Sequence, residues 1–142
     1  MNIDWSFFGI EQGSSVDADT IVQVETLLKV KFPESYLDLV IYADEASPEA
    51  ASFVYGDTGT CISEFFSFSP DVRPYTVSWY SRAGGVPGLP VRLVPIARDA
   101  GGCLICLNFD VHPVAVEAFD PGSKSSCFIA SHFDDFVGLW GA

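Results

Sequence analysis

The sequence predicts an α+β fold, in which a mostly antiparallel sheet of about five or six strands carries two N-terminal helices and one C-terminal helix. Helical periodicity is confined to the first 42 residues and to the end of the chain, whereas short β-branched and aromatic runs fill the region between them. The 142 residues show no repeat and no long linker. We therefore expect a single domain over residues 1–142.

The first helix is expected from about residue 16 to residue 28. Ser14 or Ser15 is suited to be its N-cap, and Ile21, Val24 and Leu28 recur at the spacing of one helical face. Acidic residues in the first turns favour the helix dipole. This segment is predicted to be amphipathic, with one face in the core.

The second helix is expected to start at Pro33, which is favoured as a first helical residue. Tyr36, Leu37, Val40 and Ile41 form its apolar stripe. Residues 43–49 are small, acidic or Pro and predict a solvated connection.

The central region predicts a sheet of short strands separated by Gly, Pro, Asp and Ser. Pro95 cannot donate a hydrogen bond to a neighbouring strand, which indicates an edge strand or an early strand end. Turn-like connections near residues 110–113 and 120–123 favour antiparallel neighbours. The expected strands are 52–55, 61–68, 91–97, 103–109, 114–119 and 126–130, with 103–109 central because it is apolar on both faces.

The chain is expected to end in a third helix that packs on the sheet. Ser131 begins a segment similar to a capping box, and Phe133, Phe136, Val137 and Trp140 recur at i, i+3, i+4 and i+7. Such a stripe needs an apolar surface to cover it.

Composition and charge exclude several classes of protein. Hydrophobic residues make up 49% of the chain and charged residues 18%, which excludes intrinsic disorder and a coiled coil. The net charge of −12 repels phosphate backbones and anionic lipids, so neither nucleic acid nor membrane is expected as a partner. The opening segment has no basic region before an apolar run, and we expect no targeting peptide and a cytoplasmic location.

The motifs that could carry chemistry have ordinary explanations. Cys103 and Cys106 have the spacing of half a zinc site or a redox pair, but a strand context favours reduced structural thiols. His112 and His132 have no second ligand at a diagnostic spacing, and Glu64 and Glu117 are isolated acids in strands. We expect no metal, no cofactor and no catalytic residues, and thus no enzyme.

The glycine-rich segment 83–90 is similar to a phosphate-binding loop only at first sight. It lacks the Lys followed by Ser or Thr that completes such a loop, and its two prolines remove backbone donors. It predicts a plain loop between parts of the sheet.

Three segments resemble the SUKH superfamily of yeast cell-wall-assembly-regulator-like domains. The first runs from Ile21 through Glu25 to Phe32, Pro33 and Tyr36, which is similar to the family's helix with an inner Glu followed by Leu-Pro-x-x-Tyr. Residues 94–107 resemble its central strand pair with a Gly-rich turn, and residues 128–136 resemble its last strand and helix. Residues 42–45 depart from the family pattern, which has Asn-Gly-Gly or a similar turn there.

The resemblance implies an α+β scaffold without established catalytic residues, used in bacteria chiefly by immunity proteins that bind a cognate toxin. Many of these toxins are nucleases, whose basic grooves suit an acidic inhibitor. The alternative is a regulatory scaffold of the same superfamily. Apart from these two hypotheses, the acidic helix faces by themselves have a plain explanation, which is that they keep the protein soluble.

The expected partner is therefore a toxin domain, and six residues are candidates for contact with it. Residues 43–57 hold acids and no base, and two large aromatics at 79 and 80 are not explained by periodicity. Burial of both rings in the core is the alternative. The candidate residues are Asp44, Glu45, Glu49, Asp57, Trp79 and Tyr80.

Overall fold

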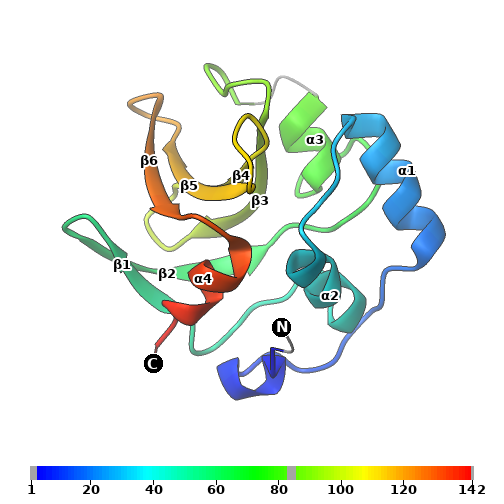
Figure 1. Ribbon diagram of the computed structural model, residues 1–142, viewed down its shortest axis with the longest axis horizontal. Coiled ribbons are helices and arrows are strands. Elements are labelled where there is room, and N and C mark those ends of the chain that lie inside the picture. The colour runs from blue at the N-terminus through cyan, green and yellow to red at the C-terminus, as the bar shows by residue number, and fades with distance from the viewer. Residues whose placement is uncertain (1–2, 83–85, 142) are drawn as a thin grey trace.

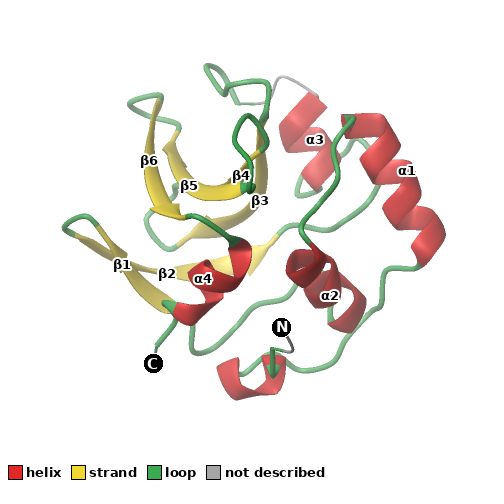
Figure 2. Ribbon diagram, in the orientation of Figure 1, coloured by secondary structure: helices red, strands yellow, loops and turns green. Residues whose placement is uncertain are grey.

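The computed structural model describes residues 3–82 and 86–141 and confirms the α+β fold. Within these residues, six antiparallel strands form one sheet in the order β1 to β6, so each strand pairs with its neighbour in the chain. The sheet is strongly curved, and the helices gather on one side of it (Figures 1 and 2). The elements are η1 Trp5–Phe8, α1 Ala18–Leu28, α2 Glu34–Tyr42, β1 Ser52–Tyr55, β2 Thr58–Phe65, α3 Val77–Arg82, β3 Leu93–Asp99, β4 Leu104–Asn108, β5 Ala115–Asp120, β6 Ser125–Ala130 and α4 Phe133–Gly138.

Helix α1 starts slightly later than the sequence predicts. Its N-cap is Asp17 and not Ser14 or Ser15, because the Asp17 carboxylate accepts a hydrogen bond of 2.8 Å from the backbone N–H of Thr20. This bond lowers the pKa of Asp17. Val24 is fully buried, as its place on the apolar face predicts.

Helix α2 presents a slightly different face to the core than its predicted stripe. Pro33 is the N-cap and lies just before the first helical residue. Tyr36, Leu39 and Val40 are buried, whereas Ile41 is 45% exposed. Glu25 of α1 accepts a hydrogen bond of 2.8 Å from the backbone N–H of Phe32, which fixes the entry to α2.

The sheet corrects the expectation for Pro95. Strand β3 is an interior strand between β2 and β4, so it is neither at an edge nor cut short at Pro95. Its register shifts between Pro95 and Ala97, and a shift of this kind accommodates a residue without an N–H donor. The expectation that residues 103–109 form a central, buried strand is confirmed by β4.

Helix α3 was not expected from the sequence. It follows a parallel bridge between Ser67 and Thr76 and packs on β3 and α1 (Figure 1). The predicted loop 83–90 lies partly outside the described residues, at 83–85, while residues 86–90 form no helix or strand.

Helix α4 ends earlier than predicted, at Gly138, so Trp140 belongs to the tail that follows it. Its N-cap is His132, which makes no side-chain capping bond, and the expected capping box is therefore absent. Phe133, Phe136 and Val137 are buried, as their spacing predicts. No helix in the described part of the chain has the length and apolar character needed to cross a membrane.

Candidate functional site

An acidic groove of about 340 Å³ lies where the N-terminal segment meets the connection after α2. The two segments are joined by hydrogen bonds, from the Asp44 N–H to the Ser14 carbonyl at 2.7 Å and from the Glu49 N–H to the Phe8 carbonyl at 3.0 Å. The groove is lined by Gly9, Ile10, Glu11, Gly13, Ala43, Asp44, Glu45, Ala46, Ser47 and Glu49. These residues include four acids and no base.

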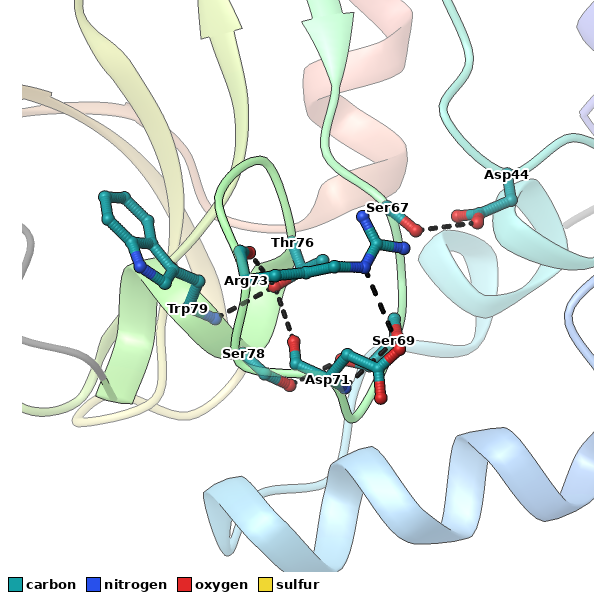
Figure 3. A network of polar contacts seen from close by, with 8 residues as sticks. All are labelled: Asp44, Ser67, Ser69, Asp71, Arg73, Thr76, Ser78 and Trp79. Carbon is teal, nitrogen blue, oxygen red and sulfur yellow. Dashed lines mark hydrogen bonds and ion pairs between the residues drawn. The ribbon is translucent and has the colours of Figure 1, made fainter.

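Asp44 holds the floor of the acidic groove in place. Its carboxylate accepts a hydrogen bond of 2.8 Å from the backbone N–H of Phe68. It also accepts one of 3.1 Å from the Ser67 hydroxyl, which Figure 3 shows. Burial raises the pKa of Asp44 above its usual value, against the effect of these two bonds. Asp44 therefore joins the connection to the segment that follows β2, and its carboxylate is only partly available to a partner.

Glu45 and Glu49 are the exposed acids of the connection. The backbone between them is anchored from below, because Ala46 and Pro48 are buried and the Ser47 hydroxyl donates to the Ser63 carbonyl at 2.8 Å. Within the described residues neither carboxylate forms an ion pair. They are thus held at the groove and remain free to meet positive charge.

Glu11 is an acid of the groove that the sequence did not indicate. It lies more than thirty positions before Asp44, and only the pairing of the two segments brings it to the same hollow. Gly9 makes this pairing possible, because a Cβ at Gly9 would lie 2.7 Å from the Cβ of Glu49. No periodicity of the sequence carries this contact.

Asp57 does not line the acidic groove. It is exposed in the turn between β1 and β2, at the tip of a hairpin that reaches away from the helices (Figure 1). The structure therefore separates Asp57 from Asp44, Glu45 and Glu49.

Trp79 and Tyr80 lie on α3 and are half-buried. The Tyr80 ring stacks on Phe66 with centroids 4.1 Å apart, and Trp79 meets Tyr80 edge to face at 4.9 Å. Burial raises the pKa of Tyr80. Neither ring lines the acidic groove, and the stacking of Tyr80 on Phe66 holds α3 against the segment that follows β2.

A second hollow, which we call the arginine hollow, adjoins the acidic groove. It measures about 480 Å³ and holds two of the chain's four arginines, Arg73 and Arg98. Arg98 pairs with Glu64 across the β2–β3 ladder at 2.7 Å. Glu45 lines both hollows, so they meet at this residue. The lining residues of the arginine hollow are Glu45, Glu64, Phe65, Phe66, Ser67, Arg73, Pro74, Tyr75 and Arg98.

A third hollow of about 420 Å³ brings both histidines together, although the sequence treats them as isolated. His112 comes from the turn between β4 and β5, and His132 from the start of α4, where its Nδ1 lies 3.0 Å from Asp135. The N-terminal part of α2 forms the opposite wall. Among the described side chains, no three His, Cys, Asp or Glu residues are grouped so that they could hold a metal ion.

The four cysteines are free thiols within the described structure. Cys106 is buried in β4, and burial raises its pKa well above the usual value. Cys103 precedes the strand, and its pKa is also raised, by burial and then by Asp99 and Asp120. Both surroundings favour the thiol over the reactive thiolate.

A family model described as SMI1 / KNR4 family (SUKH-1) matches residues 15–138. The matched span runs from the segment before α1 through α4 and includes the connection after α2. It contains the whole lining of the arginine hollow and all of the acidic groove except its N-terminal wall. No curated protein is similar enough to count as a match.

Proposed function

Because the chain belongs to the SMI1 / KNR4 family (SUKH-1), we propose that it is an immunity protein, which neutralises a cognate bacterial toxin by direct binding in the cytoplasm. It acts as a stoichiometric inhibitor and not as an enzyme. The family includes toxin immunity proteins, and binding is the activity for which this surface is best suited.

The observation that carries the proposal is the acidic groove. It gathers four carboxylates with no base, and the bonds of Asp44 keep its floor rigid before any partner arrives. A nuclease needs positive charge around its substrate, and such a surface is attracted to a groove of this charge. A preformed groove also loses little conformational entropy on binding.

The test is binding to the toxin domain encoded beside this gene. The groove variant replaces Glu11→Gln, Glu45→Asn and Glu49→Gln and leaves Asp44 intact. Asn is chosen at position 45 because Glu45 has φ 58°, a left-handed conformation that Asn tolerates better than Gln. We expect a one-to-one complex for the parent and binding at least about tenfold weaker for the groove variant.

A matched control separates local from overall charge. It replaces Asp19→Asn, Glu34→Gln and Asp38→Asn, which are exposed, do not line the groove and form no ion pair in the described part of the chain. Each variant loses three negative charges, but the control should bind within about threefold of the parent because its acids lie away from the contact. Equal binding by parent and groove variant would refute the groove, and no complex with the parent would refute the function.

A further inference from the structure

The segment between β2 and α3 contains a hydrogen-bonded loop that we call the tyrosine loop, residues 69–76. The backbone N–H of Ser67 donates to the Tyr75 carbonyl, and the N–H of Val77 donates to the Ser67 carbonyl, both at 3.0 Å. These two bonds close the base of the loop. The loop therefore has the fixed ends that a short strand pair provides.

Two buried hydroxyls hold the interior of the tyrosine loop. The Thr76 hydroxyl lies within hydrogen-bond distance of two carbonyl oxygens, that of Asp71 at 2.8 Å and that of Arg73 at 2.7 Å (Figure 3). The Ser78 hydroxyl donates to the Ser69 carbonyl at 2.6 Å. Thr76 and Ser78 are fully buried. These buried hydroxyls therefore fix the shape of the exposed loop.

Tyr75 is the residue that this loop presents. Its backbone has φ 70°, a region in which a bulky side chain is strained and glycine is not. Its side chain is nevertheless 60% exposed and makes no ring contact in the described structure. An exposed ring kept in a strained conformation contributes little to the core, and such strain is typical of functional positions.

The surroundings of Tyr75 have the composition of an interface centre. Tyr75 and Arg73 line the arginine hollow, and Tyr and Arg are among the residues enriched at binding hot spots. Arg73 is only loosely paired, with 3.8 Å between its Nε and Asp71. Its charge is therefore open to a carboxylate from outside. Glu45 stands on the same hollow and also has a positive φ, of 58°.

We infer that Tyr75 is the anchor of one protein interface that covers the acidic groove and the arginine hollow together. This inference rests on the proposed function and specifies its partner: a basic protein surface that also carries one carboxylate, placed to pair with Arg73. The two hollows meet at Glu45, so one partner can contact both. A stable interface buries about 800 Å² on each side, which is more surface than one small hollow offers.

The charge pattern also sets the orientation of the partner. Negative charge lies at the groove and positive charge at Arg73, so only one of two opposite orientations matches both ends. The Tyr75 ring then supplies the desolvated contact between the two charged ends.

The test compares binding of the neighbouring toxin domain to Tyr75→Gly, Arg73→Glu and the parent. Glycine adopts φ 70° without strain, so Tyr75→Gly should keep the thermal midpoint within about 2 °C of the parent. We expect its affinity to fall at least about tenfold, chiefly through faster dissociation. Arg73→Glu should weaken binding by a similar factor.

The control is Phe128→Ala, which removes an equally exposed ring from β6 at the far edge of the sheet. It should bind within about threefold of the parent. If Tyr75→Gly lowers the thermal midpoint by more, Tyr75→Asn, which also tolerates a positive φ, replaces it in the comparison. If the Tyr75 variants bind like the parent while the groove variant is weakened, the anchor is wrong and the proposed function stands; if the parent forms no complex, both fail.

Discussion

The carboxylate of Asp44 accepts hydrogen bonds from groups of two buried residues. Ser67 is 5% exposed, and the N–H of Phe68 belongs to a fully buried residue. Asp44→Ala would leave both donors without a partner and should lower the free energy of unfolding by about 1–3 kcal/mol. Asp44→Asn should cost less than about 1 kcal/mol, because the amide oxygen still accepts from Phe68 and the amide nitrogen still reaches Ser67. Urea denaturation of the two variants measures the difference.

The same carboxylate makes stability depend on pH. Burial raises the pKa of Asp44 in the folded state, so the folded state binds the proton more tightly than the unfolded chain does. The resulting stabilisation is complete below the unfolded pKa of 3.8 and is lost as pH rises through the higher folded value. Asp44→Asn has no such proton, and its stability relative to the parent should therefore increase with pH from about 4 upward. A difference that stays constant over this range would contradict the assigned cause.

At the scale of single residues, the sequence predicts where charge is concentrated but not which acids are engaged. The absence of bases between residues 43 and 57 identified Glu45 and Glu49, both exposed in the structure. The bonds of Asp44 reach 23 and 24 positions along the chain, to Ser67 and Phe68, and no local pattern reports them. Glu11 was not predicted as part of the groove for the same reason, because no local pattern shows that the N-terminal segment pairs with the connection after α2.

At the scale of elements, the tail after α4 is the clearest case of a segment held by packing. Trp140 is 7% exposed, and its ring lies against the rings of Trp5, Phe8, Phe65 and Phe136. Trp140→Ala should lower the free energy of unfolding by about 3–5 kcal/mol. Trp140→Phe should cost less, because it keeps an aromatic ring and removes an indole N–H that is buried without a hydrogen-bond partner in the described structure. A loss below about 1 kcal/mol for Trp140→Ala would show that the tail frays in solution.

Elements whose apolar pattern extends over several turns could be predicted, whereas those defined by long-range contacts could not. Helices α1 and α2 carry enough turns for their apolar faces to be recognised. Helices α3 and α4 have six residues each, less than two full turns, but the apolar stripe of α4 continues to Trp140, whereas α3 has no such continuation. Pro95 led to the wrong prediction of an edge strand, because the preference of Pro for strand edges takes no account of a register shift in the pairing with the next strand. Trp140 has the spacing of the helical stripe, but the chain leaves the helix before it, and the next residue, Gly141, forms a bridge with Ser52, 89 positions earlier.

At the scale of the whole molecule, the fold turns a scattered charge distribution into a patterned surface. The net charge of −12 is visible in the sequence. The placement of Arg73 and Arg98 beside a base-free acidic groove is not, because it requires the N-terminal segment, the connection after α2, the tyrosine loop and β3 to meet. The sequence therefore shows the overall charge, and the structure adds where on this chain the acidic and the basic side chains lie.

The whole-molecule charge predicts how association depends on salt. Attraction between a protein of charge −12 and a basic toxin domain acts over distances longer than the contact itself, and it is screened within about 10 Å at 0.1 M salt and about 3 Å at 1 M. The association rate constant should therefore fall at least about tenfold between 20 mM and 500 mM salt, whereas the dissociation rate constant should change by less than about threefold. The groove variant should show a shallower salt dependence than the control variant that lost three distant acids, because charges nearest the contact act most strongly on the encounter. Stopped-flow or surface-binding kinetics measures all three proteins, and an association rate of the parent that is insensitive to salt would show that long-range attraction does not guide this complex.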